Sequence, residues 1–534
     1  RHSAMRAGLV LAVACACAPC AAGAGGSREL QRQPSAQLVP QPPTLRALDR
    51  RLRHDLRDVR VDDYEPSGTE LAVRSVELLV LFAPVLFCAP LAYALPVFRN
   101  RVWYYMLART LGFAGTAFIK WAQWASTRTD LFPDALCRQL GRLRADAPRH
   151  SRGHTRRLVS AAVGGPLESF FDSFEPDPVA SGSVAQVHFA SVRGVRVAVK
   201  VRHPKVVERI ATDFTLMRGA AGLCKRLGVL SWLDLDETVR QFSAVIGAQT
   251  QLQTEARHLQ LCRRNFRAWR DCVFPQPLLA TPDVIVESYE EGRHVSDWTD
   301  RPVEAAPPGT PALPGPAGSP ALSPEARHFV VVRGEDVYLK MLLSDNLMHA
   351  DLHPGNILLD TQRRSFPVLV LVDLGMVAVL TREEQEHFLG LLHAMGNGDG
   401  RAAAKHVLAF ADEQPNADPE AFANDMEALF KAKCRGYGTR PDFGEVVRGV
   451  LSAVRKSRVR VSPNYMTLII NAMCLDGMAR AMEPSYNVLD AARPLLRLHE
   501  RLPRFLFRLC LPLARRAKAA NDARHLRRMR AGRA

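Results

Sequence analysis

The sequence predicts an α+β protein with two lobes, a small β-containing lobe and a larger helical lobe, preceded by a helical extension. Alternating apolar and polar residues around Arg193-Gly194 in "VAQVHFASVRGVRVAVKVRHP" predict a β-hairpin. Residues 205–268, and most of the chain beyond a Pro/Ala/Gly-rich stretch at 302–324, have helical patterns. Strands first and helices later along the chain favour this division into lobes.

The length and the net charge of the chain limit the number of domains and the kinds of binding partner to expect. The 534 residues are enough for about two to four domains, and the net charge of +17 favours anionic partners such as nucleic acid, acidic lipid or phosphorylated ligands. Nucleic acid is not expected, because the sequence lacks zinc spacing, a helix-turn-helix pattern and an aromatic RNA-binding signature. The arginine-rich C-terminus is interpreted as a solvated basic tail, with contact to anionic lipid as the alternative.

The first residues indicate targeting. No acid precedes Glu29, and an apolar run of small residues follows Arg6. This pattern suits a secretory signal, whereas the arginines between residues 28 and 53 suit a mitochondrial transit peptide. Cys15, Cys17 and Cys20 cluster here, but no second ligand pair stands nearby, so a metal site is not favoured. The other cysteines are scattered and show no disulfide framework, which fits a reducing interior.

An apolar segment runs for 21 residues from Leu78 to Phe98 without a charge. That length can cross the hydrocarbon core of a membrane. Pro84, Pro90 and Pro96 each remove a helical hydrogen bond, so a spanning helix would be kinked. Two interpretations stay open: a membrane span, or a buried or interfacial segment.

These patterns divide the chain into seven expected segments. They are a targeting segment and linker (1–60), an apolar segment (61–102), a helical extension (103–170), the β-containing lobe (171–298), a flexible Pro-rich insert (299–326), the helical lobe (327–500) and a basic tail (501–534).

The stretch "HADLHPGN" carries the chemistry. Asp351 and Asn356 are five residues apart, and Asp373 follows in "LVDLG" at the end of a β-branched run. Phosphoryl transfer needs one carboxylate that orients and deprotonates the acceptor, and an amide and a second carboxylate that hold Mg²⁺ against nucleotide phosphates. The alternative is a polar turn. His349 and His353 are spaced like zinc ligands, but Pro354-Gly355 argues against the helix that would align them.

A second element favours phosphoryl transfer. A loop of small residues precedes "VAVK", as the glycine-rich hairpin of kinases precedes the lysine on the third strand. Lys200 supplies the cation, and Glu255 is its best candidate partner on a predicted helix; the alternative for Glu255 is a solvated glutamate. The loop residues expected at the phosphates of ATP are Val179, Ala180, Ser181, Gly182, Ser183, Val184, Ala185, Gln186 and Val187.

A third element is the helix "FIKWAQWASTRTDLFP". It places Lys120, Gln123 and Ser126 on one face, and Trp121, Trp124 and Phe132 are expected to pack around them. Elementary physics predicts only an amphipathic helix with a polar stripe.

Together these motifs resemble the UbiB family, the aarF-domain-containing atypical kinases of mitochondria, plastids and bacteria. The resemblance rests on the Lys120-x-x-Gln123-x-x-Ser126 helix, "ASGSVAQVH", "VAVKVRHP", "HADLHPGN" and "DLGM", and it covers about residues 103–500.

The resemblance implies a protein-kinase-like fold with a helical extension packed over the active cleft. It implies that Lys120 and Gln123 occlude the cleft, that Lys200 pairs with Glu255, and that Asn356 and Asp373 hold Mg²⁺. It also implies ATP hydrolysis and a role in coenzyme Q or other isoprenoid-lipid metabolism at a mitochondrial membrane, rather than protein phosphorylation. The expected partners are ATP, an anionic mitochondrial lipid surface and isoprenoid-lipid biosynthetic proteins.

The chain departs from the family pattern in three places. Ala122 stands where the family has glycine, the loop has one glycine among its small residues, and Gln249 and Gln251 replace an acid-x-acid pair that would contact Lys120. The last change puts that autoinhibitory contact in doubt.

Two alternatives stay open. "HADLHPGN" also resembles the loop of aminoglycoside and choline kinases, which would make the protein a small-molecule phosphotransferase, although those enzymes lack the lysine-glutamine helix. A non-enzymatic nucleotide-binding scaffold for lipid-biosynthetic partners is the second, although Lys200, Asp351, Asn356 and Asp373 are all present.

Overall fold

A computed structural model gives the fold, and the chain divides into two compact units. Unit 1 comprises Arg1–Gln260 and Gln276–Tyr289, and unit 2 comprises Leu261–Pro275 and Glu290–Ala534. The structure describes residues 37–38, 64–127, 132–143, 149–226, 239, 243, 246–247, 249–299, 322–362, 366–411, 417–439, 441–503, 506–507, 509–514 and 517–518.

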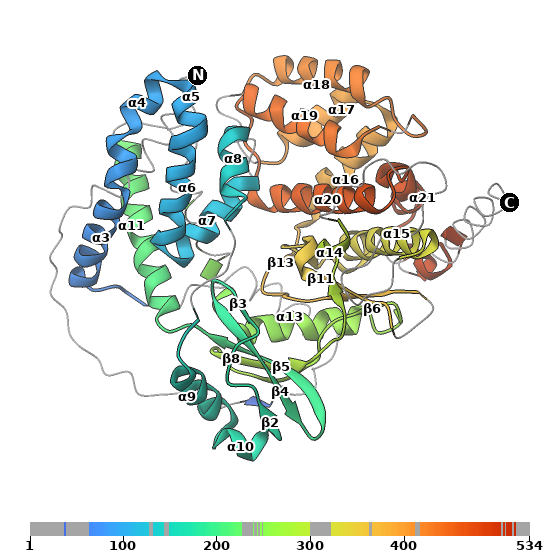
Figure 1. Ribbon diagram of the computed structural model, residues 1–534. Helices are drawn as coiled ribbons and strands as arrows, with labels where there is room; N and C mark the ends of the chain where they lie inside the picture. The colour runs from blue at the N-terminus through green and yellow to red at the C-terminus, as the bar shows by residue number, and fades with distance from the viewer. Residues whose placement is uncertain are drawn as a thin grey trace. The chain divides into compact units, whose positions relative to one another are not determined.

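Helices form the first part of unit 1 (Figure 1). The first long helix begins at a capping box in which Ser67 and Glu70 satisfy each other's backbone amides. Phe82, Leu111, Phe118 and Phe214 are fully buried among these helices and form their core. The helices are α3 (Gly68–Phe87), α4 (Ala89–Ala94), α5 (Pro96–Phe98), η1 (Arg99–Trp103), α6 (Tyr104–Ala114), α7 (Thr116–Thr127), α8 (Asp134–Leu140) and α11 (Val206–Arg226).

An antiparallel sheet of seven strands forms the rest of unit 1, in the order β1-β7-β8-β5-β4-β2, with β3 also paired to β4. Helices α9 (Arg152–Val163) and α10 (Leu167–Phe170) accompany it, and α13 (Leu252–Asn265) follows α11 in the chain. The strands are β1 (Gln37–Leu38), β2 (Ser173–Phe174), β3 (Ala180–Ser181), β4 (Ala185–Val192), β5 (Val195–Arg202), β7 (Pro277–Ala280) and β8 (Val284–Ser288).

The predicted hairpin turn is confirmed. Val192 pairs with Val195, and Arg193 and Gly194 between them have φ angles of 51° and 74°. Positive φ at both central residues is the geometry of a two-residue turn that matches the twist of the flanking strands.

Unit 2 is mainly helical. Its four-stranded sheet has the order β6-β12-β11-β9, and a separate pair joins β10 to β13. The strands are β6 (Cys272–Val273), β9 (Arg293–His294), β10 (Met348–His349), β11 (Ile357–Asp360), β12 (Val368–Leu371) and β13 (Val377–Ala378). The helices are α14 (Ser296–Thr299), α15 (Pro324–Lys340), η3 (Met341–Asp345), η4 (Pro354–Asn356), α16 (Arg382–Asn397), α17 (Gly400–Leu408), α18 (Pro419–Lys433), α19 (Phe443–Lys456), α20 (Pro463–Met482) and α21 (Val488–Arg501).

The predicted fold class is confirmed: an α+β protein with a β-containing lobe, a larger helical lobe and N-terminal helices. The stretch "FPVLVLVDLGMVAVL" holds two strands that do not pair with each other, because β12 pairs with β6 and β11 while β13 pairs with β10.

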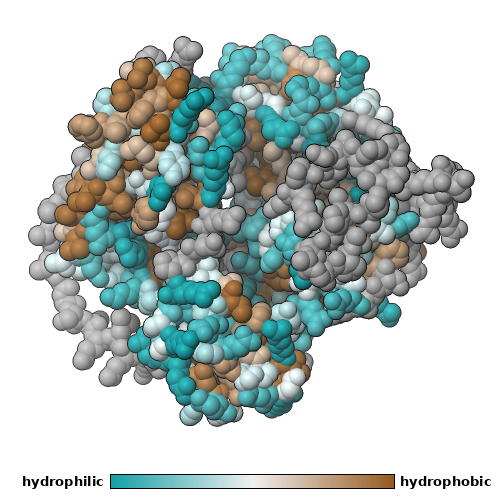
Figure 2. Space-filling model, viewed as in Figure 1, coloured by the Kyte–Doolittle hydropathy of each residue, from teal (hydrophilic) through white to brown (hydrophobic). Residues whose placement is uncertain are grey.

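The apolar segment at 78–98 has one side packed against protein and another side exposed. Its α3 part packs Leu78, Phe82 and Val85 into the core of unit 1. Val80 and Phe87 on the opposite face are 70% and 88% exposed. Residues Gly68–Ala94 are long and apolar enough to cross a membrane. Figure 2 shows the apolar surface that gathers over α3–α6. The segment is therefore partly buried, and the membrane-span and interfacial interpretations both stay predictions.

Several predicted segments lie outside the described residues. These are the targeting segment and linker apart from Gln37–Leu38, the cysteine cluster, nearly all of the Pro-rich insert, and most of the basic tail.

Candidate functional site

The loop that carries Asp351 lies beside the loop that carries Asp373 in unit 2. The β10–β13 pair flanks both loops, and the amide of Ala350 donates to the carbonyl oxygen of Met376 at 3.0 Å. Strands β11 and β12 pair Ile357 with Leu371, and the amide of Val372 donates to the carbonyl oxygen of Asn356 at 3.0 Å. This register places Asn356 next to Val372, the residue that precedes Asp373, although Asn356 and Asp373 are 17 positions apart in sequence.

The side chain of Asn356 is fixed in orientation. Its Nδ2 donates to the carbonyl oxygen of Asp351 at 3.0 Å, which ties the two ends of the D-x-x-x-x-N motif together. Asn356 is buried, whereas the Asp351 side chain is 41% exposed. The amide is therefore held by its own loop, and the Asp351 carboxylate remains accessible to a ligand.

Asp373 has an unusual backbone. Its φ is 57°, in the left-handed region that L-residues other than Asn and Asp seldom adopt. Its Oδ1 accepts from the amide of Gly375 at 3.4 Å, and the residue is exposed. Such a conformation costs about 1–2 kcal/mol, and it occurs at active sites as well as at turns such as Arg193.

His349 connects the two loops. Its Nδ1 accepts from the amide of Asp351 at 3.2 Å, and its Nε2 donates to the carbonyl oxygen of Val372 at 3.3 Å. Burial lowers the pKa of His349, which keeps the ring neutral with its proton on Nε2. A ring engaged in this way is not a metal ligand, and the described residues contain no group of three or more His, Cys, Asp or Glu side chains that could hold a metal ion.

Asn471, on α20, supports the same loop, and the sequence analysis missed it. Its Nδ2 donates to the carbonyl oxygen of His349 at 2.5 Å, and its Oδ1 accepts from the amide of Leu352 at 3.3 Å. The side chain is buried and spans the backbone on either side of Asp351. A lone amide within the apolar run "YMTLIINAMCL" is the signal that could have found it.

The other half of the predicted site lies in unit 1. The Nζ of Lys200, on β5, lies 2.5 Å from an oxygen of Glu255 on α13. A second carboxylate, that of Glu287 on β8, lies 3.3 Å away. Both carboxylates are buried and the lysine side chain is 15% exposed. The expected Lys200–Glu255 ion pair is therefore present, and Glu287 is an additional member that the sequence analysis did not identify.

The predicted phosphate loop is the β3–β4 hairpin. Ala180 pairs with Val187, Ser181 pairs with Gln186, and the amide of Gly182 donates to the carbonyl oxygen of Ala185 at 2.9 Å. One detail of the prediction is corrected. Gln186 belongs to the loop by its backbone only, because its fully buried side chain is hydrogen-bonded inside the unit and is not available to a nucleotide.

Helix α7 carries the predicted lysine-glutamine motif and begins at this loop. The hydroxyl of Thr116 donates to the carbonyl oxygen of Ser183 at 3.0 Å. The three aromatic residues named with this motif pack on one another, since the Trp121 ring lies 6.5 Å from that of Trp124 and 5.6 Å from that of Phe132. Among the described residues, no carboxylate lies within salt-bridge distance of Lys120.

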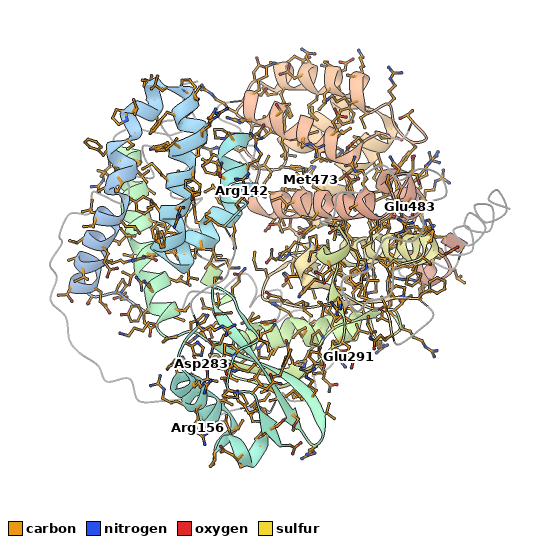
Figure 3. The ribbon with its side chains drawn as sticks, in the orientation of Figure 1. Arg142, Arg156, Asp283, Glu291, Met473 and Glu483 are labelled. Atoms are coloured by element: carbon orange, nitrogen blue, oxygen red, sulfur yellow. The ribbon has the colours of Figure 1, made fainter. Side chains whose placement is uncertain are left out.

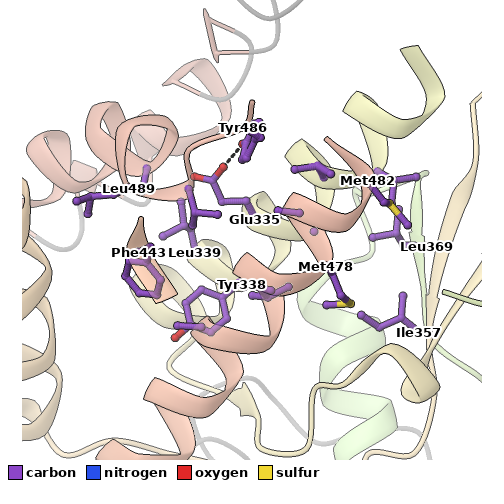
Figure 4. A pocket seen from close by; sticks show the side chains of 18 of the residues that line it. Glu335, Tyr338, Leu339, Ile357, Leu369, Phe443, Met478, Met482, Tyr486 and Leu489 are labelled. Atoms are coloured by element: carbon purple, nitrogen blue, oxygen red, sulfur yellow. Dashed lines mark hydrogen bonds between the residues drawn. The ribbon is translucent and has the colours of Figure 1, made fainter. Parts of the chain in front are cut away.

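An apolar cavity lies elsewhere in unit 2, between side chains of α15, α20 and α21 (Figure 4). Glu335 and Tyr486 form a hydrogen bond at its edge, and Lys518 lies 3.4 Å from Glu335. Burial raises the pKa of Glu335 to about 7. None of the predicted site residues lines this cavity.

The structure thus assembles each half of the predicted site. Lys200, Glu255 and Glu287 meet in unit 1, while Asp351, Asn356 and the backbone at Asp373 meet in unit 2. Convergence of the two halves on one nucleotide, and occlusion of the cleft by Lys120 and Gln123, stay predictions.

The chain is similar to several curated proteins. It is 27% identical to a probable serine/threonine-protein kinase, abkC, of Dictyostelium discoideum, over 82% of this chain and 70% of the relative. It is 26% identical to a mitochondrial ABC1 family protein of Saccharomyces cerevisiae, over 81% and 75%. It is also 29% identical to a probable protein kinase UbiB of Marinobacter nauticus, over 72% and 67%.

Among solved structures, the chain is similar to the Rv3197–erythromycin complex from Mycobacterium tuberculosis. The match covers 64% of this chain and 80% of the solved chain, with 18% identity and a TM-score of 0.42. The family model described as ABC1 atypical kinase-like domain matches residues 142–407, which include Lys200, Asp351 and Asp373. The chain belongs to the ABC1/UbiB family of atypical kinases.

Proposed function

We propose that this protein binds Mg-ATP and acts as an atypical kinase or ATPase at a mitochondrial membrane, in support of coenzyme Q or other isoprenoid-lipid metabolism. The observation that carries the proposal is the organisation of two half-sites: a lysine between two buried carboxylates in unit 1, and an Asp-Asn-Asp set on paired loops in unit 2. Phosphoryl transfer needs a cation at the nucleotide phosphates, a carboxylate at the acceptor and oxygen ligands for Mg²⁺, and these groups offer all three.

Each side chain has a role in the proposal. Lys200 binds nucleotide phosphates, and Glu255 holds its ammonium in place. The accessible Asp351 carboxylate orients the acceptor hydroxyl or water and takes its proton. Asn356 and Asp373 offer an amide oxygen and a carboxylate oxygen, the hard donors that suit Mg²⁺. When bound, Mg²⁺ would neutralise charge on the phosphates.

The membrane part rests on the exposed face of α3–α6. Val73, Val76, Val80 and Phe87 project from one side of α3, opposite its buried face. Arg101 and Arg109 are exposed close by in the chain. An apolar face with flanking cations suits a membrane that contains anionic lipid. A mitochondrial location is supported by the relatives from Saccharomyces cerevisiae and Schizosaccharomyces pombe whose names include mitochondrial.

The finer relationship is also a proposal. The stretches "KWAQWASTRTDLFP" and "ESYEEG" support a closer similarity to the second human mitochondrial aarF-domain-containing kinase than to other members. Lys120 and Gln123 are proposed to restrict access of a protein substrate to the cleft. The basic tail is a second candidate for contact with the membrane. Isoprenoid-lipid biosynthetic proteins are the candidate protein partners.

The test is ATP hydrolysis by the purified protein with Mg²⁺, with and without liposomes that contain anionic lipid. The proposal expects hydrolysis that rises with liposomes and that Asp373→Asn abolishes. ATP binding without turnover under both conditions would indicate a scaffold. Phosphate transfer to a soluble amino-alcohol would indicate a small-molecule phosphotransferase.

A further inference from the structure

A chain of histidine hydrogen bonds runs behind the phosphate loop in unit 1. His203, just after β5, contacts His150 through their Nδ1 atoms at 2.8 Å, and His150 Nε2 lies 3.0 Å from the hydroxyl of Thr155 on α9. Gln186 Nε2 lies 3.2 Å from that hydroxyl and 3.0 Å from Nε2 of His188. Two residues labelled in Figure 3 help to find this chain: Arg156 follows Thr155 on α9, and the carboxylate of Asp283 lies 2.6 Å from Arg202, the residue before His203.

One arrangement of protons satisfies this chain. His188 Nδ1 donates to the carbonyl oxygen of Glu175 at 3.0 Å, so its Nε2 is an acceptor for Gln186. The Thr155 hydroxyl has two acceptors within reach, His150 Nε2 at 3.0 Å and His188 Nε2 at 3.4 Å, and it donates to the nearer one because Gln186 already donates to His188. His150 Nδ1–H then donates to His203 Nδ1. The only proton left on His203 is therefore on Nε2.

That proton is directed at the loop. Nε2 of His203 donates to the carbonyl oxygen of Gly182 at 3.0 Å. The backbone amide of the same residue donates to the carbonyl oxygen of Val184 at 2.9 Å. The hydroxyl of Thr116 donates to the carbonyl oxygen of Ser183, the residue between Gly182 and Val184. Three consecutive loop carbonyls are thus bonded to donors from the rest of unit 1.

Such a loop suits an anionic ligand. Carbonyl oxygens repel phosphate and amide protons attract it, so a phosphate loop must turn its carbonyls away from the ligand. Within the described part of the chain, the amides of Ser183 and Val184 have no hydrogen-bond acceptor. They are the donors that remain for a phosphate.

We propose that His203 is a positioning residue for nucleotide binding: it fixes the loop carbonyls inward, and the chain through His150, Thr155 and Gln186 fixes its tautomer. The inference rests on the proposed function, because the ligand of the loop is taken to be a nucleotide. Burial lowers the pKa of His203 and His188, and burial with repulsion from neighbouring histidines lowers that of His150 to about 3, which keeps the rings neutral as this arrangement requires.

Two substitutions separate the donor from the bulk of the ring. In His203→Gln, the side-chain amide nitrogen of glutamine reaches the position of Nε2 and keeps a donor for the carbonyl oxygen of Gly182. The amide of His203→Asn reaches only the position of Nδ1, so that donor is lost. His154→Gln is the matched control, since the His154 ring lies 4.7 Å from that of His150 but its Nε2 contacts the carbonyl oxygen of Arg202, outside the chain.

The experiment measures the dissociation constant for Mg-ATP, and hydrogen exchange at Ser183 and Val184 without nucleotide. His203→Asn is expected to weaken binding about five- to tenfold, the effect of one lost hydrogen bond, and to speed exchange, while His203→Gln and His154→Gln stay near wild type. Equal effects of the Asn and Gln variants, or unchanged exchange in His203→Asn, would overturn the inference. If the wild type does not bind nucleotide, the proposed function fails, and the exchange comparison still decides whether His203 fixes the loop.

Discussion

Replacement of the two carboxylates beside Lys200 is expected to be strongly non-additive. Nζ lies 2.5 Å from Glu255 and 3.3 Å from Glu287, and the lysine side chain is 15% exposed. Glu255→Gln keeps the shape but removes one charge-assisted hydrogen bond, which contributes about 1.5–3 kcal/mol. Glu287 still neutralises the ammonium. Each single variant should therefore lose about 1.5–3 kcal/mol of unfolding free energy.

The double variant removes both charges. An ammonium left in the interior without a counter-ion is costly beyond the two lost bonds, because no carboxylate remains to neutralise it. The loss should therefore exceed the sum of the singles by about 1–3 kcal/mol, in the range of coupling energies between residues in contact. Urea unfolding followed by circular dichroism measures this, with the exposed Glu291 (labelled in Figure 3) changed to Gln as the control, expected within about 0.5 kcal/mol of wild type. An additive double variant, or a Glu255→Gln variant as stable as the control, would refute the reasoning.

Three further predictions follow from the same geometry. Asn471→Ala leaves the His349 carbonyl and the Leu352 amide unsatisfied; it should cost about 2–3 kcal/mol in urea unfolding and lower kcat for ATP hydrolysis more than it raises KM. The free energy of unfolding should fall as the pH drops from about 6.5 towards 3, because the unfolded chain binds a proton at His150 in this range while the folded pKa of His150 is held at about 3. His150→Gln should reduce the slope of unfolding free energy against pH, and an unchanged slope would contradict this. Val80→Glu with Phe87→Glu should reduce co-sedimentation with anionic liposomes about tenfold, whereas Val195→Glu, at the exposed first residue of β5, should not; equal effects would exclude the α3 face as the contact.

Local patterns in the sequence were sufficient for the elements and the order of the motifs. The Arg193-Gly194 turn was predictable because a two-residue hairpin loop requires positive φ at both positions, and glycine and alternation mark it. The Lys200–Glu255 pair was predictable from the kinase-like order of motifs, since Glu255 lies on a helix that follows the strand of Lys200.

The supporting residues were not predictable, because they depend on which elements become neighbours. Glu287 reaches Lys200 only because β8 pairs with β5, where Ala198 opposes it. Asn471 reaches the Asp351 loop from a helix 119 residues away in the chain. The inward side chain of Gln186 had a local signal, since it alternates with His188 on one face of β4, but its partners lie on another element.

Length and hydropathy alone could not place the apolar segment at 78–98. A membrane span and an amphipathic helix of the same length differ in whether one side packs against protein. Phe82 and Val85 are buried while Val80 and Phe87 are exposed, so the decisive information is the packing of α3 in unit 1.

The most direct test of the account is the Mg²⁺-dependent part of thermal stabilisation by ATP. A ligand at 100 times its Kd stabilises the folded state by about 2.7 kcal/mol, so wild type should show a higher Tm with ATP and Mg²⁺ than with ATP and a chelator. Asp373→Asn should lose this difference, and Lys200→Met should lose the response to ATP under both conditions. A wild-type protein that ATP does not stabilise, or variants that respond as wild type does, would contradict the claim that Lys200 and Asp373 act on one nucleotide.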